Sequence, residues 1–117
     1  MAHRYFTGSG SAQGTAQIII DGVQREGISN ALVDSCVQEK NGVTVVLLVF
    51  ERYYYRAQNR ASLSVMIISD SEANVTIDAV GSGGGQGVFF SFSWGAEDNF
   101  VRILERVLIN HGFSARE

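Results

Sequence analysis

Residues 43–68 read VTVVLLVFERYYYRAQNRASLSVMII, and this block decides the fold. Residues 43–55 predict one long strand, residues 56–60 a polar turn, and residues 61–69 a second strand. The first strand is apolar on both faces through Phe50, which indicates a central strand covered on both sides or covered by another subunit. The block also holds the densest group of charged and phenolic side chains in the chain.

Further strands flank this block. Asn-Gly within residues 40–42 is a strong hairpin signal, so residues 30–39 are predicted to pair with the strand that begins at Val43. Alternating apolar residues predict strands at 3–8, 75–80 and 88–94 as well.

Two helices are predicted from apolar residues at helical spacing. One covers residues 12–26, with Ser11 available as its N-cap. The other follows the acidic pair Glu97 and Asp98 and ends at Gly112. The order strand, helix, five strands, helix predicts an α+β two-layer sandwich with an antiparallel meander sheet. This single domain of residues 1–117 is similar in order to TATA-binding-protein-like and helix-grip folds, an analogy of fold that carries no function.

Composition excludes several classes of function. Apolar residues make up 45% and charged residues 18% of the chain, which is typical of a globular protein. The net charge of −3 gives no electrostatic support to nucleic-acid binding. The longest apolar run, residues 45–50, is too short to cross a membrane. Two separated histidines and a single cysteine offer no metal-ligand spacing, so we expect neither a metal nor a cofactor.

Cys36 is the only cysteine, so no intrachain disulfide can form. We expect it to be a small buried side chain on a strand and the protein to reside in the reducing cytoplasm.

The glycine-rich run 81–87, GSGGGQG, is the most conspicuous motif. Phosphate-binding loops use glycines to bring backbone N–H groups close to the anion, with a helix N-terminus behind them. Here a strand-like run follows and no Gly-Lys-Ser/Thr is present. A hairpin tip or a close backbone approach is therefore favoured over phosphate binding.

The segment at the end of the long strand is the best candidate site. A glutamate and a tyrosine two residues apart share a strand face and could act as a base and a phenolic donor, while arginines could hold an anion. The alternative is structural: cross-strand ion pairs and tyrosines closing the end of the sheet. No catalytic residue is assigned. The expected ligand-binding residues are Glu51, Arg52, Tyr53, Tyr55, Arg56, Arg60, Gly83 and Gln86.

Three motifs carry a resemblance: ERYYY at residues 51–55, NRASL at 59–63 and GSGGGQGVFF at 81–90. With these the chain resembles a small bacterial family of single-domain proteins of unknown function, over nearly its whole length. The resemblance implies no activity, cofactor or catalytic residue. It implies that the arginine–tyrosine segment and the glycine run are family features.

Two functions from different classes follow. The first is a small cytosolic binding domain, with a pocket for a small or anionic ligand between the sheet and the C-terminal helix, near residues 51–60 and the glycine run. The second is a homodimeric structural or interaction protein, indicated by more apolar surface than two helices easily cover. An enzyme that uses Glu51 and a tyrosine as an acid–base pair is the least favoured hypothesis. The sequence does not identify a ligand.

Overall fold

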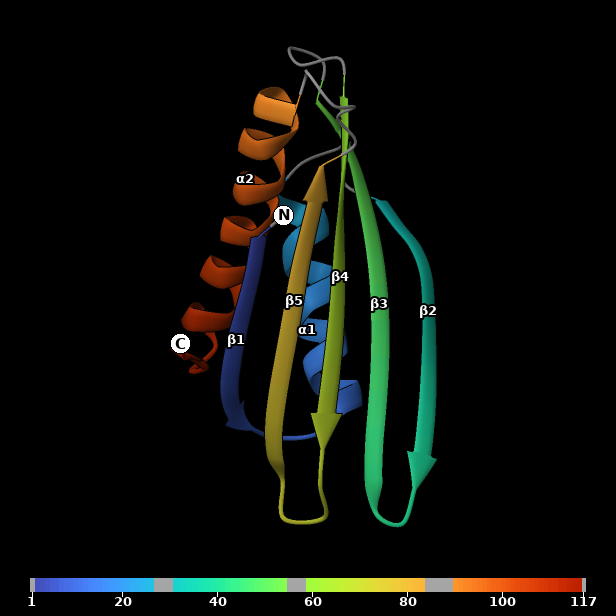
Figure 1. Cartoon of the computed structure of the whole chain (residues 1–117). Helices are drawn as coiled ribbons and strands as arrows, with labels where there is room; N and C mark the ends of the chain where they lie inside the picture. The colour runs from blue at the N-terminus through green and yellow to red at the C-terminus, as the bar shows by residue number, and fades with distance from the viewer. Residues whose placement is uncertain (1, 27–30, 55–58, 84–89, 117) are drawn as a thin grey trace.

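The computed structural model describes residues 2–26, 31–54, 59–83 and 90–116. Its strands form one six-stranded antiparallel sheet of order β2-β3-β4-β5-β1-β6 (Figure 1). Both helices pack on the same face of this sheet, which confirms the predicted two-layer α+β class. The elements are β1 (Ala2–Ser9), α1 (Ala12–Arg25), β2 (Ala31–Lys40), β3 (Val43–Tyr54), β4 (Asn59–Ser69), β5 (Asn74–Gly83), α2 (Phe90–Asn110) and β6 (Ser114–Arg116).

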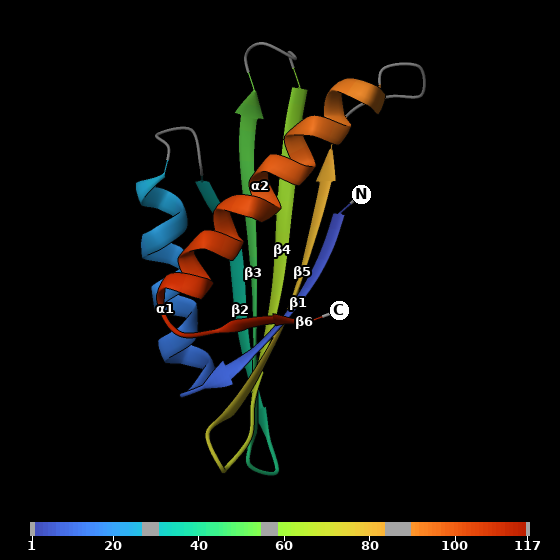
Figure 2. The same ribbon diagram turned by 90° about the vertical axis from the view of Figure 1, so that its left-hand side faces the viewer.

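The core lies between one face of the sheet and the helices. Alternate residues of β3, β4 and β5 point toward the helices and are almost completely buried. In Figure 2, α2 crosses the sheet obliquely and α1 runs beside it. Together they cover that face with the apolar stripes that the sequence predicts. The largest fully buried side chains include Phe6, Ile19, Leu48, Phe50, Leu63, Ile67, Ile77, Phe100, Leu104 and Leu108.

Neither described helix lies on the other face of the sheet, and we call this face the open face. Its central side chains are partly exposed, with Leu47 at 38% and Met66 at 37%. The prediction that β3 is covered on both sides within the chain is therefore wrong. Both described helices pack on the covered face and bury β3, β4 and β5, so neither is left to cover the open face.

The expected strand over residues 88–94 is also wrong in the part that the structure describes, because Phe90 already begins α2. The short alternating run does not separate a strand from a buried helical segment by its periodicity. As a result Glu97 and Asp98 lie inside α2 rather than in its first turn. The sixth strand comes after α2 instead. Gly112, at φ 89°, reverses the chain into β6, as its predicted role at the helix end requires.

Cys36 is exposed, which makes the prediction of a buried cysteine wrong. It lies on β2, and this strand stands at the edge of the sheet beyond the cover of the helices. A strand pattern predicts which residues share a face but does not predict which strand is left at the edge. Cys36 is also paired with Leu47 and therefore points to the open face, so the exposed thiol follows from both the face and the edge position.

The start of α1 is fixed by two serines. Ser11 accepts a hydrogen bond from the Gly14 backbone N–H at 2.9 Å, which confirms the predicted N-cap. Ser69, from the end of β4, accepts from the Ala12 N–H at 3.0 Å and is itself buried. Two of the unsatisfied N–H groups of the helix start are thereby paired. The second contact also fixes α1 to the sheet.

A network around Asp70 closes the turn between β4 and β5. Its Oδ1 accepts from the backbone N–H groups of Glu72 and Asn74 at 2.9 and 3.0 Å, and its Oδ2 accepts from the Asn74 side-chain amide at 3.1 Å. These hydrogen bonds favour the ionised form, those from Asn74 most strongly, and hold the pKa of Asp70 below its ordinary value of 3.8. Ala73 occupies the left-handed region in this turn, at φ 63°.

Asp70→Asn tests this network by its pH dependence. Because the folded-state pKa is lowered, the contribution of the carboxylate is fully present above the unfolded value of 3.8 and is lost as the pH falls through the folded value. We expect the wild type to have a higher Tm than the variant near neutral pH, and this difference to shrink below about pH 3.8. Thermal unfolding across the acid range measures it. A difference that is constant from neutral to strongly acidic pH would contradict this account.

Gly22 allows α1 and α2 to approach each other. A Cβ built at this position would lie 2.5 Å from Cγ1 and 2.7 Å from Cγ2 of Val107, closer than real Cβ contacts. The glycine lies inside a helix, where it costs about 0.5–1 kcal/mol relative to alanine. Close helix packing outweighs that cost here.

We therefore expect Gly22→Ala to lower the free energy of unfolding, because overpacking costs about 1–3 kcal/mol and exceeds the gain in helix propensity. In a Val107→Ala background the two Cγ contacts are removed and only the Cβ of residue 107 stays close, at 3.2 Å, so the same substitution should destabilise the protein much less. Urea unfolding of the four proteins in this double-mutant cycle measures this coupling. Stabilisation by Gly22→Ala in the wild-type background would refute the close contact.

Candidate functional site

The structure brings together three of the residues predicted for a site. Glu51, Arg60 and Gly83 line one depression of about 220 Å³ at the end of β3, β4 and β5. Cross-strand pairing explains this, because Glu51 is opposite Ser62 and Ser62 is opposite Ser82. We call this depression, which Ala61 also lines, the Glu51 corner.

The Glu51 corner belongs to the open face. Ala61 and Leu63 are buried under the helices, so Arg60 and Ser62 alternate to the other side. Arg52 is opposite Ala61 and thus lies on the covered face, away from the corner. Tyr53 is opposite Arg60. The remaining predicted residues, Tyr55, Arg56 and Gln86, lie outside the described residues.

One ion pair dominates the Glu51 corner. Nη1 of Arg60 donates to Oε1 of Glu51 at 3.3 Å. The two side chains are 69% and 43% exposed, so solvent screens the interaction. The arrangement fits the structural reading of this segment as closely as the functional one.

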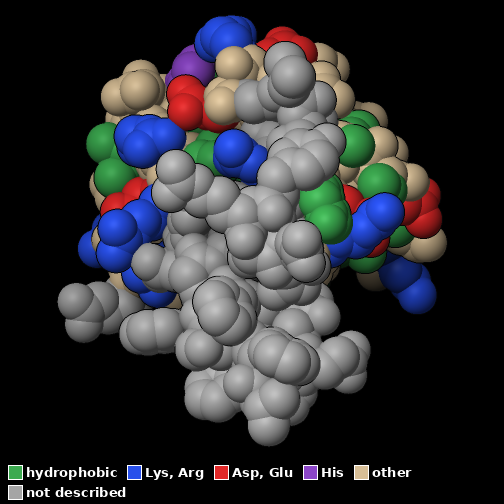
Figure 3. Space-filling model, turned by 90° about the horizontal axis from the view of Figure 1, so that it is seen from above, with side chains coloured by type: hydrophobic (Ala, Val, Ile, Leu, Met, Phe, Trp, Pro, Cys, Tyr) green, Lys and Arg blue, Asp and Glu red, His purple; other side chains and the backbone are tan. Residues whose placement is uncertain are grey.

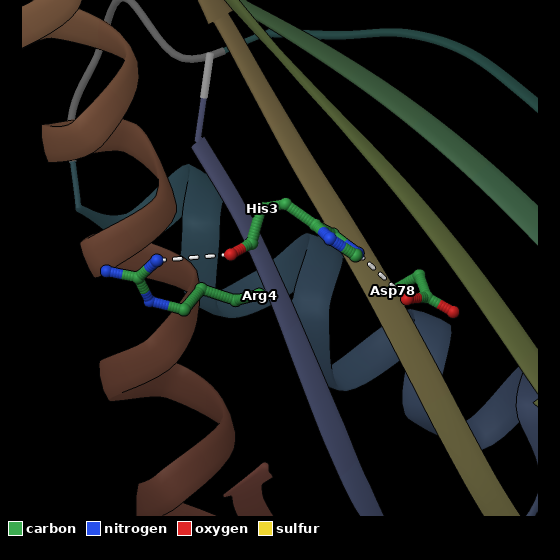
Figure 4. Close-up of polar contacts among 3 residues, drawn as sticks. All are labelled: His3, Arg4 and Asp78. Carbon is green, nitrogen blue, oxygen red and sulfur yellow. Dashed lines mark hydrogen bonds and ion pairs between the residues drawn. The ribbon is translucent and has the colours of Figure 1, made fainter. Parts of the chain in front are cut away.

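Another polar pair lies further along the open face. Nε2 of His3 on β1 is 2.9 Å from Oδ1 of Asp78 on β5 (Figure 4). Arg4 follows His3 directly, and its side chain points the opposite way, toward α2. Nη1 of Arg4 donates to the His3 carbonyl at 3.1 Å. β1 therefore presents a histidine to the open face and an arginine to the helix.

A larger groove lies between β1 and α2, with a volume of about 390 Å³. Seen from above in Figure 3, Lys and Arg side chains gather on the left-hand side, where α2 lies. Three guanidinium groups and one carboxylate are among the side chains that line it, together with one amide and one aliphatic side chain. We call it the arginine groove; its lining residues are Arg4, Arg102, Glu105, Arg106, Ile109 and Asn110.

Ion pairs hold Arg4 and Arg106 in place. Nε of Arg4 is 3.5 Å from Oε1 of Glu105, and Nη2 of Arg106 is 2.9 Å from Oε1 of Glu26 at the end of α1. All four side chains are at least one third exposed, which keeps these pairs weak. The groove thus combines fixed guanidinium groups with access to solvent.

Reasoning from the sequence missed the arginine groove. Arg102 and Arg106 are four residues apart on α2, and this spacing alone places them on one face. A polar helix face of this kind is ordinarily exposed to solvent and has no binding role. The signal that would mark it is the third arginine, Arg4, which lies about a hundred positions earlier in the chain. Only the packing of α2 against β1 brings it there.

Neither a metal site nor a membrane span is found in the part of the chain that the structure describes. No three His, Cys, Asp or Glu side chains among these residues are grouped to hold a metal ion. Neither described helix is both long and apolar enough to span a membrane.

The chain belongs to a family of unknown function, DUF6054, whose model matches residues 1–112. This agrees with the resemblance to an uncharacterised family that the sequence motifs indicate. No curated protein and no solved structure matches the chain. The likeness to TATA-binding-protein-like or helix-grip folds therefore stays a prediction, and the function has to be argued from the site itself.

The Glu51 corner yields a test of its structural role. Because the ion pair is exposed, we expect Glu51→Gln and Arg60→Gln each to change the free energy of unfolding by less than about 1 kcal/mol. The double variant should give a coupling energy of about 0.2–1 kcal/mol in urea unfolding. A coupling well above that range would identify the pair as a structural element of the sheet end.

Proposed function

We propose that this protein is a small binding domain whose arginine groove takes up a small anionic ligand with a carboxylate or phosphate group. The observation that carries the proposal is the convergence of Arg4, Arg102 and Arg106 from two separate elements on one groove. This occurs in a chain whose net charge is −3, so a general excess of basic residues does not account for it. The groove lies between β1 and α2 and is a different place from the pocket expected near residues 51–60 and the glycine run.

The charge pattern of α2 supports a ligand. Arg102 and Arg106 are neighbours at i and i+4, and like charges at that spacing destabilise a helix by about 0.2–0.5 kcal/mol. An anion held between them turns this repulsion into two attractions. Each planar guanidinium can donate two parallel hydrogen bonds to one carboxylate or phosphate.

The existing ion pairs determine how such a ligand would bind. It competes with Glu105 for Arg4 and with Glu26 for Arg106. Because those pairs are solvent-screened, an anion of higher charge displaces them at little cost. We therefore expect moderate affinity that falls as the salt concentration rises.

Binding is favoured over catalysis at this place. Among the residues that line the groove, Glu105 is the only acid, and it already pairs with Arg4. The lining contains no serine, cysteine or histidine that could serve as a nucleophile or shuttle a proton. We therefore favour a non-enzymatic role.

The Glu51 corner remains a second candidate binding site. It is favoured by the clustering of Glu51, Arg60 and Gly83 at one depression.

The exposed thiol of Cys36 on β2 supports our proposal of a cytoplasmic location, because a reducing compartment preserves free thiols. Nucleic acid is disfavoured as a partner by the net charge.

Thermal shift with inorganic phosphate and citrate as probes, at constant ionic strength, tests the proposal. A ligand at a hundred times its Kd raises the stability of the protein by about 2.7 kcal/mol, so a clear increase in Tm is expected for the wild type. The increase should be lost in Arg102→Gln and in Arg106→Gln, each compared with its own unliganded Tm. It should persist in Arg25→Gln, a matched control on α1 outside the groove.

Two results would refute groove binding. One is an equal shift in the wild type and the two groove variants. The other is the absence of any shift with either probe and with a broader panel of phosphorylated and carboxylated metabolites. A shift that disappears in Arg60→Gln instead would transfer the proposal to the Glu51 corner.

A further inference from the structure

β2 is an exposed edge strand of ten residues (Figure 1). Only Leu32 is partly buried, while Val33 and Val37 are 50% and 52% exposed. Apolar β-branched residues of this kind are unusual on a strand that remains in solvent, and a free edge is a template for another strand. Its pairing with β3 is interrupted by a register shift between Leu32 and Asp34, so the regular edge runs from Asp34 to Lys40.

The hairpin with β3 shows which backbone groups face outward. Asn41 and Gly42 have φ of 54° and 80°, the left-handed values of a two-residue type I′ turn. Such a turn makes Lys40 and Val43 a hydrogen-bonded pair, and every second residue before Lys40 likewise bonds to β3. The residues in between therefore direct their N–H and C=O groups away from the sheet; they are Ser35, Val37 and Glu39.

Asp34 gives independent support for this assignment of the outward-facing backbone groups. Its Oδ1 accepts a hydrogen bond from the Ser35 N–H at 2.8 Å. That N–H group is thus available to a side chain and is not part of the ladder with β3. In the single chain, Asp34 satisfies an edge donor that a neighbouring strand would otherwise satisfy.

We propose that a second copy of this chain pairs with this edge, β2 against β2 in antiparallel orientation, with Val37 opposite the partner's Val37. The two sheets then form one continuous sheet around a twofold axis. In this register Ser35 is opposite the partner's Glu39, and the outward N–H and C=O groups of both strands form the new ladder.

Charge complementarity selects the register. With Val37 at the centre, Asp34 lies opposite the partner's Lys40, and the twofold axis produces this pair twice. Both side chains point to the open face, since Asp34 is paired with Val49 and Lys40 with Val43 on β3. A shift of the centre by one residue in either direction removes the match, because Asp34 then meets neither Lys40 nor any other cation of β2. Lys40 is the only lysine of the chain.

The rest of the register is compatible with pairing. Cys36 is opposite the partner's Gln38, and no like charges are opposed along the strand. In the dimer the Asp34 side chain gives up its hydrogen bond from the Ser35 N–H, which then donates to the partner's backbone. The Asp34 carboxylate pairs with the partner's Lys40 instead. The arginine groove stays accessible, because β1 and β2 lie toward opposite edges of the sheet. Failure of either proposal therefore leaves the other intact.

Charge exchange tests the pairing. Light scattering should give the wild type a mass of twice 12.7 kDa at high concentration. Asp34→Lys and Lys40→Asp each place like charges opposite one another and should weaken the dimer at least tenfold in Kd. The double variant restores both pairs and should regain dimerisation. Far-ultraviolet circular dichroism controls for folding.

Three outcomes would overturn the proposal: a monomeric wild type, single variants that dimerise as well as the wild type, or a double variant that stays monomeric. Single variants that dimerise as well as the wild type would indicate an interface elsewhere on the open face. Met66→Lys, on that face of β4 and separated from β2 by β3, distinguishes the two interfaces, because it should leave the β2 dimer unchanged.

Crosslinking tests the register separately, in a Cys36→Ser background. Val37→Cys places two thiols in a hydrogen-bonded pair with Cα atoms about 5.5 Å apart, within the reach of a disulfide. Ser35→Cys is the matched control, because its two copies are offset by four residues, or about 13 Å. Mild oxidation should yield a covalent dimer from Val37→Cys only. Equal crosslinking of both variants, or preferential crosslinking of Ser35→Cys, would refute the register.

Discussion

Burial of one face of the sheet by two helices is the constraint on which the rest of the structure depends. β4 shows it most clearly, because Ala61, Leu63, Val65 and Ile67 are all 0–1% exposed beneath the helices. Full burial of a large aliphatic side chain contributes about 1.5–3 kcal/mol, so this alternating row and its neighbours on β3 and β5 are a major source of stability. The close approach of α1 to α2 at Gly22 belongs to the same constraint, since both helices must fit over a few strands.

This constraint also determines where functional chemistry can lie. The interior between sheet and helices is filled with apolar side chains in the described residues, so a ligand is left with the margins. One margin is the seam between β1 and α2, where three arginines converge. Another is the end of the open face at Glu51, and a third is the edge strand β2. Each lies where the cover of the helices ends, and each supports a different kind of interaction.

Local sequence signals were informative where one element determines its own structure. The Asn41-Gly42 turn, the Ser11 cap and the apolar stripe of α2 from Phe100 onward follow from spacing and side-chain type, and the structure contains all three. The start of α2 was missed because a short alternating apolar run is compatible with a strand as well as a helix. Cys36 was misjudged, and cover of β3 on both sides within the chain was the wrong one of two alternatives, because burial depends on strand order and on which face the helices take, both properties of the whole sheet.

The sequence by itself therefore determined the fold class, the pairing of residues 43–54 with residues 59–69, and the cluster of Glu51 with Arg60, all through contacts between neighbouring segments. Only the tertiary structure decided that β1 returns to lie beside β5 and α2, which places Arg4 next to Arg102 and Arg106. It also decided that β2 is left at the edge. The physical reason is that periodicity is a local property, whereas the order of strands and the placement of a helix follow from burying all apolar faces at once.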